Sequence, residues 1–208
     1  RPRNPLRAYY WYGRQREALV KSLSRRFGAG FAVFGNGWQG IQGAQGPSSF
    51  ASQVDTCRRA RIVVGGVPYS PARYYMSNRP FMQIASGVPF VDVSVEGVDR
   101  ILRDGEHWHL VDAPDRVGDK VDELLCRSDR SRQEMGMAAA RYVSANHTDA
   151  QRWRGLVNTL ATLRTAILTN RAPESPDLDF LLPEVDRTAE LPLATRGYSA
   201  LGHVPTLS

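Results

Sequence analysis

The chain has few of the residues that build disulfide frameworks or zinc sites, and no long apolar run. Its 208 residues include two cysteines, Cys57 and Cys126, which are far apart and belong to no CxxC or His–Cys pattern. We therefore expect two reduced thiols in a cytoplasmic protein. No run of about 18 apolar residues could span a bilayer, and no charged-then-apolar leader opens the chain, so we expect a soluble protein with no membrane span.

One phosphate-binding pattern is also absent. The sequence contains no GxxxxGK[ST] motif, which argues against a P-loop. Histidine is scarce, so only four side chains could act as a base near neutral pH: His107, His109, His147 and His203. His107 and His109 flank Trp108 on a predicted strand and would share one of its faces. A structural role is favoured for each histidine, and we assign no catalytic base and no metal ligand.

The composition is typical of a folded domain with more basic than acidic residues. Hydrophobic residues make up 42% of the chain, which suits one sizeable domain followed by a tail. Lys and Arg number 27 against 21 Asp and Glu, a net charge of +6 that is spread along the chain. This charge favours anionic partners, and nucleotides, nucleic acids and acidic polymers all remain open. The first residue is Arg1 rather than Met, which suggests the latter part of a longer chain.

Candidate strands and helices alternate along the chain. The run at residues 61–66 is β-branched without polar alternation, as expected for a strand that is covered on both faces. Strands are predicted at 7–13, 31–38, 61–66, 89–93 and 107–112. Helices are predicted at 14–27, 51–60, 78–86, 96–103, 115–127 and 131–145. The pattern predicts an α/β fold, a Rossmann-like open parallel sheet of about five or six strands with helices on both faces.

The last part of the chain changes character. Thr148 and Gln151 form a capping-box pattern that would start a long final helix ending near residue 169. We assign residues 7–170 to the domain. Residues 171–208 hold several prolines and scattered apolar side chains with little periodicity, which predicts an extended arm. The apolar side chains of the arm would lie on another domain or another subunit.

The unusual residues fall where such sheets bind their ligands. Ligands lie beyond the carboxyl ends of parallel strands, and the turns expected there contain Gly13, Gly35-Asn36-Gly37 and Gly65-Gly66. Glycines let backbone amides approach a phosphate, although each could equally serve only a tight turn. Ser77-Asn78-Arg79 stands at the predicted start of a short apolar helix, where free N–H groups and an arginine favour an anion.

Several ordered motifs resemble one enzyme family. "SNRPFMQIASGVPFVDV" is similar to its Ser-Asn-Arg motif, short helix and small-residue-Gly-x-Pro turn into a strand. "VEGVDRILRDGEHWHLVD" and "RYVSANHTDAQR" are similar to its acidic-Gly-acidic loop and its closing His-Thr junction, and "YYWYG" and "FAVFGNGW" to its first two strands. From about residue 9 to residue 160 the chain thus resembles the C-terminal, donor-binding half of GT-B glycosyltransferases, especially the group 1 type related to CgeB.

The resemblance implies a function and a set of binding residues. It implies a metal-independent glycosyltransferase with no cofactor, whose donor substrate is a nucleotide-diphosphate sugar bound between two Rossmann-like domains. Ser77, Asn78 and the following amides would receive the diphosphate, and Arg79 would offset its charge. Arg14 would be a second cation. Gln83 completes the predicted donor site, together with Gly13 and the turn formed by Gly35, Asn36 and Gly37.

Two departures from the family keep a second function open. Met82 stands where the family usually has a carboxylate for the donor's ribose, and Gln83, one residue along the helix, would point about a quarter turn away. The acceptor domain, which the family places N-terminally, has no room in this chain, so we expect it as a preceding domain or a partner chain. The alternative is a catalytically degenerate binding or assembly module that oligomerises through the arm. A nucleic-acid-binding function ranks third because no recognition motif is present.

Overall fold

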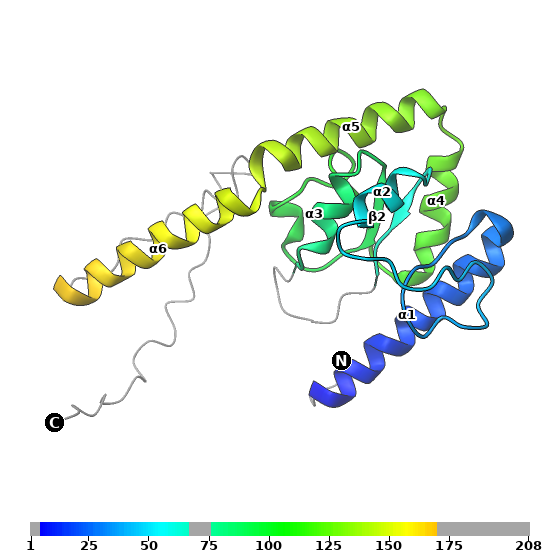
Figure 1. Ribbon diagram of the computed structural model, residues 1–208, viewed down its shortest axis with the longest axis horizontal. Coiled ribbons are helices and arrows are strands. Elements are labelled where there is room, and N and C mark those ends of the chain that lie inside the picture. Colours follow the sequence, from blue (N-terminus) through cyan, green and yellow to red (C-terminus); the bar gives the residue numbers. More distant parts are fainter. Residues whose placement is uncertain (1–4, 67–75, 170–208) are drawn as a thin grey trace.

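The computed structural model describes residues 5–66 and 76–169, which form a small parallel sheet between helices (Figure 1). The strands are β1 (Val63–Val64), β2 (Phe90–Val93) and β3 (His109–Val111), in the order β1-β2-β3. Both pairs are parallel, with Val64 opposite Val91 and Val91 opposite His109. The α/β class and the open parallel sheet are therefore confirmed.

Helices surround the sheet. The longer ones are α1 (Pro5–Phe27), α4 (Val117–Leu125), α5 (Asp129–Asn146) and α6 (Asp149–Thr169). Two helices of six residues each are α2 (Gln53–Arg58) and α3 (Arg79–Ile84). Single 3-10 turns are η1 (Gly28–Gly30), η2 (Val98–Arg100) and η3 (Pro114–Arg116).

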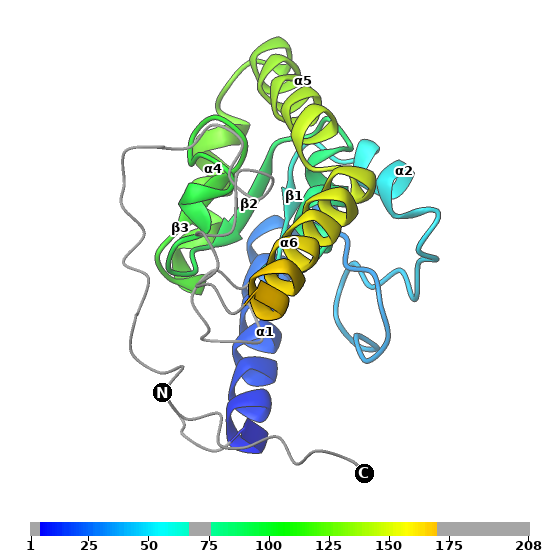
Figure 2. The ribbon, with the colours of Figure 1, turned by 90° about the vertical axis from the view of Figure 1, so that its left-hand side faces the viewer.

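Alternate residues of β2 face two separate cores. Val91 is fully buried with Tyr12, Leu19 and Leu23 of α1 and with side chains of α4. Phe90 points to the other face, where it packs with residues of α3 and α5. Figures 1 and 2 show α3 and α4 on opposite sides of the sheet. Helices on both faces, as the hydrophobic strand pattern predicted, are thus confirmed.

The predicted strand at residues 7–13 is wrong, because this segment belongs to α1. The aromatic run has high strand propensity, but Tyr12, Leu19 and Leu23 recur at helical spacing and are at most 6% exposed. Burial of that stripe against α4 outweighs local propensity. Gly13 consequently lies inside a helix and forms no turn at the sheet edge.

The predicted strand at residues 31–38 is also wrong. This segment is part of a loop in which only one isolated bridge forms, between Val33 and Ala44. Glycines with positive φ, including Gly35 at 129° and Gly43 at 91°, turn the backbone away from an extended ladder. The described residues therefore contain three strands rather than the predicted five or six.

The other predicted helices and strands are present with different ends, with one exception. The helix predicted at 96–103 is wrong, because only the η2 turn forms there, after Gly97 with its φ of 87°. The final helix is confirmed with its capping box, since the Thr148 N–H donates to Gln151 Oε1 at 2.8 Å and the Gln151 N–H donates to Thr148 Oγ1 at 3.3 Å. α6 extends away from the sheet (Figure 1). The predicted arm at 171–208 lies outside the described residues.

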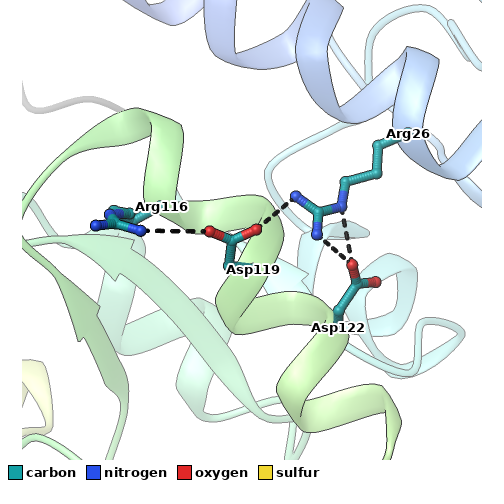
Figure 3. A network of polar contacts seen from close by, with 4 residues as sticks. All are labelled: Arg26, Arg116, Asp119 and Asp122. Carbon is teal, nitrogen blue, oxygen red and sulfur yellow. Dashed lines mark hydrogen bonds and ion pairs between the residues drawn. The ribbon is translucent and has the colours of Figure 1, made fainter.

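An exposed ion network joins α1 to α4 (Figure 3). The guanidinium group of Arg26 donates to Asp119 Oδ1 and, through Nε, to Asp122 Oδ2, both at 2.8 Å. Gly118 leaves room for it, because a Cβ there would lie 2.7 Å from Arg26 Nη1. Exposed pairs of this kind stabilise little individually, so the network mainly fixes how α1 lies along α4, and α1 carries Arg16 toward the site described below.

Candidate functional site

A pocket opens at the carboxyl ends of β1 and β2. This is the edge at which parallel α/β sheets bind ligands. Four of its lining residues belong to the Ser77 motif and α3, and the others include Arg16 of α1, residues at and after the ends of β1 and β2, and Val98 of η2. The lining residues are Arg16, Gly65, Gly66, Met76, Ser77, Arg79, Pro80, Gln83, Asp92, Val93, Val95, Val98 and Trp108.

Asp92 lines this pocket, where a glycine immediately follows β1. The parallel register places Gly65 opposite Asp92, and the Gly65 N–H donates to the Val91 carbonyl at 2.8 Å. A Cβ on Gly65 would lie 2.5 Å from Asp92 Cγ, so glycine alone leaves the carboxyl group its space. Oδ1 of Asp92 accepts the N–H of Val93 at 2.8 Å.

Burial changes the protonation of Asp92. It raises the pKa of Asp92 to about 7, against the opposing effects of the Val93 N–H, Arg79 and Arg16. The carboxyl group is therefore close to half-protonated at neutral pH. Asp92 was missing from the predicted site, although a carboxylate at the end of an otherwise apolar strand was the available signal.

Two arginines bring positive charge to the pocket from different elements. Arg79 is the first residue of α3, and Arg16 reaches the pocket from α1. Arg16 passes over Gly66, since a Cβ on that glycine would meet Arg16 Nε at 3.4 Å. Arg16 was also missed, because the segment before it was interpreted as a strand and turn rather than as one continuous helix.

The structure brings Gln83, rather than Met82, to the pocket. Oε1 of Gln83 is buried and accepts no hydrogen bond from the described residues. A buried polar atom without a partner costs about 1–3 kcal/mol. Met82, half-buried on the same helix, does not line the pocket. Of these two neighbouring positions, the one that lines the pocket carries an amide.

The other predicted site residues are not gathered here. Gly13 and Arg14 lie on α1 without lining the pocket, and Arg14 donates to the Tyr10 hydroxyl at 3.4 Å. The loop residues 35–37 do not line it either, and Gly35 packs beside the Trp38 indole. Asn78 immediately precedes α3 and makes no side-chain cap. Ser77, Arg79 and Gln83 are the predicted residues that the structure brings together.

Two of the histidines belong to an aromatic cluster behind α3. His107 stacks on Tyr142 of α5 with ring centroids 3.7 Å apart, and its Nδ1 accepts the Arg103 N–H. His147 lies 5.1 Å from the Phe81 ring, and burial, followed by Arg152 and His107, lowers the pKa of His147 to about 4. Both imidazoles are suited to packing as neutral rings.

The expectation that His107 and His109 share a face of one strand is wrong. His107 precedes β3 and packs against α5, whereas His109 lies on β3 near Lys120 and Glu123 of α4. Burial lowers the pKa of both histidines. Neither lines the pocket.

Comparison with known proteins identifies the family. A family model described as glycosyl transferase-like matches residues 14–158, well over half of the chain. The chain belongs to the glycosyl transferase-like family. No curated protein matched the chain. Membership supports a general glycosyltransferase function and implies a sugar donor, and the matched segment contains every residue that lines the pocket.

The described residues contain neither a helix that could span a membrane nor a cluster of metal-binding side chains. None of the helices in residues 5–66 and 76–169 is long and apolar enough to cross a membrane. Within the same ranges, no group of three or more His, Cys, Asp and Glu side chains is placed to hold a metal ion. Cys57 and Cys126 are unpaired.

Proposed function

We propose that this chain is the donor-binding half of a GT-B glycosyltransferase of the CgeB-like type, and that the pocket at the ends of β1 and β2 receives a nucleotide-diphosphate sugar. One observation carries the proposal. In a member of the glycosyl transferase-like family, the strand-end pocket is lined by two arginines together with Ser77 and Gln83.

Each of these side chains has a role in the proposed site. Arg16 and Arg79 would bind the diphosphate from two elements, and the Ser77 hydroxyl would donate to a phosphate oxygen. Gln83 would pair with a sugar or ribose hydroxyl, which donates to the amide oxygen that lacks a partner. The remaining wall, including Val95, Val98 and Trp108, is apolar and would exclude water from these contacts.

The proposed reaction transfers the sugar to a nucleophilic group of an acceptor. The bond between the anomeric carbon and the diphosphate oxygen breaks, the bond to the acceptor forms, and the nucleoside diphosphate leaves with the bonding electron pair. Two arginines beside that oxygen stabilise the charge as it develops, which is how a metal-independent enzyme would promote departure. The acceptor and its base come, in this proposal, from a preceding domain or a partner chain in the cytoplasm.

Calorimetric titration with uridine and guanosine diphosphate tests the binding site. Arg79→Ala should weaken binding by about 1.5–3 kcal/mol, the scale of a charge-assisted contact. Arg130→Ala is the matched control, because Arg130 is an exposed arginine of α5 whose Nε pairs with Glu134 at 2.9 Å, outside the pocket. Equal losses in both variants would mean that only the net charge matters.

Met82 motivates the alternative of a catalytically degenerate assembly module. The resemblance places an acidic residue at that position, and its absence is consistent with a lost donor site. The same titration distinguishes the two functions: a chain that binds neither diphosphate at any pH is a module, and one that binds them through Arg79 has kept its donor site.

A further inference from the structure

Asp92 is a carboxyl group placed inside a pocket that otherwise suits an anion. It faces Arg16 from α1 and Arg79 from α3, and the N–H of Val93 from its own strand. Gly65, which follows β1, brings no charge, and the other described residues that line the pocket are uncharged. The pocket therefore contains two positive charges and one group whose charge depends on pH.

An ionised Asp92 would repel a diphosphate bound in the same pocket. A nucleoside diphosphate adds at least about two negative charges at neutral pH, and a like charge within a few ångströms in a desolvated site strongly favours the protonated form of a carboxyl group. In the empty pocket, burial already raises the pKa of Asp92 to about 7. Binding an anion would raise it further, so the acid would be neutral in the complex.

A neutral carboxylic acid can do what a carboxylate cannot. Its O–H donates a hydrogen bond, and a donor to an ionised phosphate oxygen forms a contact roughly twice as strong as one between neutral groups. Oδ1 of Asp92 is occupied by the Val93 N–H at 2.8 Å, which leaves Oδ2 as the oxygen to carry the proton. The Cβ-free Gly65 leaves this carboxyl group its space in the pocket.

We propose that Asp92 is a donor-binding residue that acts in its protonated form, so that the pocket takes up a proton together with the diphosphate. This inference rests on the proposed function, because it deepens the chemistry of the same site. The proton ends on Oδ2 of Asp92 and is shared with a phosphate oxygen. Arg16 and Arg79 then no longer neutralise a charge on Asp92 and can act on the ligand.

The sign of the pH dependence follows from linkage. The pKa of Asp92 is higher in the complex than in the empty pocket, so binding is strongest at low pH and weakens as pH rises above about 7. The affinity falls by up to about tenfold per pH unit when one proton is coupled to binding. The fall stops once the pH exceeds the pKa of Asp92 in the complex. Working between pH 7 and 9 avoids the titration of the terminal phosphate itself, near about pH 6.

The experiment is calorimetric titration of the full chain with uridine diphosphate at pH 7, 8 and 9. At pH 8 it is repeated in two buffers with different ionisation enthalpies, which reports the protons taken up by the wild-type protein without any variant. We expect uptake of roughly half to one proton and a total weakening of about 25-fold or more from pH 7 to pH 9.

Two variants separate this proposal from a purely structural Asp92. Asp92→Asn keeps the shape and always has an N–H donor, so its affinity should change by no more than about twofold from pH 7 to pH 9 and exceed that of the wild type at pH 9 by at least about tenfold. Asp55→Asn, at an exposed position of α2, should retain the wild-type pH dependence.

The outcomes are distinct. Binding without proton uptake, or Asp92→Asn binding more weakly than the wild type at every pH, overturns the inference and identifies Asp92 as an ionised anchor for the arginines, while the proposed function stands. No binding of uridine or guanosine diphosphate at any pH overturns both.

Discussion

Gly65→Ala should destabilise the domain through one specific contact. The added methyl would lie 2.5 Å from Cγ and 2.6 Å from both carboxyl oxygens of Asp92, far closer than van der Waals contact. Asp92 is held by the Val93 N–H and enclosed at the strand end, so either β1 or the carboxyl group must move. Inserting a methyl into such a packed site costs about 1–3 kcal/mol.

A double-mutant cycle isolates that contact. Asp92→Ala removes Cγ and both oxygens, so the methyl of Gly65→Ala then has space, and the double variant should be more stable than the sum of the single effects predicts by about 1–2 kcal/mol. The measurement is urea unfolding followed by circular dichroism at pH 7. The pocket supplies a second assay, because displacement of Asp92 should also abolish the pH dependence of uridine diphosphate binding.

Gly13→Ala is the matched control for the same substitution. Gly13 lies exposed within α1, and a Cβ there would meet nothing within 4 Å. Alanine should therefore stabilise the domain by about 0.5–1 kcal/mol, as expected within a helix. Additive effects of Gly65→Ala and Asp92→Ala would refute the contact argument, and a destabilising Gly13→Ala would contradict the helical assignment of that segment.

Two further predictions concern the rest of the chain. The pKa of His147 is lowered to about 4 in the fold, against about 6.5 when unfolded, so the unfolded chain binds the extra proton and stability should fall by about 2 kcal/mol between pH 7 and pH 5. In His147→Leu, the free energy of unfolding measured with urea should change little between pH 7 and pH 5. If it falls as much as in the wild type, His147 is not the cause of the decrease. Deleting residues 172–208 should leave far-ultraviolet circular dichroism intact while weakening assembly or activity. Failure of the truncated chain to fold would instead place the arm in the domain's core.

Sequence patterns that do not depend on long-range packing predicted the central part of the fold. The β-branched run at residues 61–66 and the apolar run at 89–93 became β1 and β2, and the Thr148–Gln151 capping box began α6 as expected. The capping box depends only on neighbouring residues, and an apolar run of this kind indicates a strand that is covered on both faces. Neither signal depends on which distant segment packs against it. They also placed the Ser77 motif at the correct edge of the sheet.

The missed residues depend on contacts between distant segments. Tyr12 is buried because α1 lies against α4, and this packing makes a helix of an aromatic run that favours strands in isolation. Arg16 reaches the pocket only as part of that helix. Asp92 lines the pocket beside Gly65, which follows β1 and leaves the carboxyl group its space, and burial raises its pKa. The carboxylate itself is visible in the sequence, but these contacts between distant segments are not.

The methionine at residue 82 is weaker grounds for lost activity than the family pattern suggests. A loss of function through that position requires residue 82 to face the donor, but the pocket is lined by Gln83, whose Oε1 is buried without a hydrogen bond from the described residues. A degenerate pocket has no need to keep such an atom, because an apolar side chain there would remove its cost of about 1–3 kcal/mol. Asp92 leads to the same conclusion, since a buried carboxyl group with a raised pKa destabilises the fold at neutral pH unless a ligand uses it. Two residues that line one pocket thus carry polar groups that are costly in the fold, which favours a site that still binds its donor.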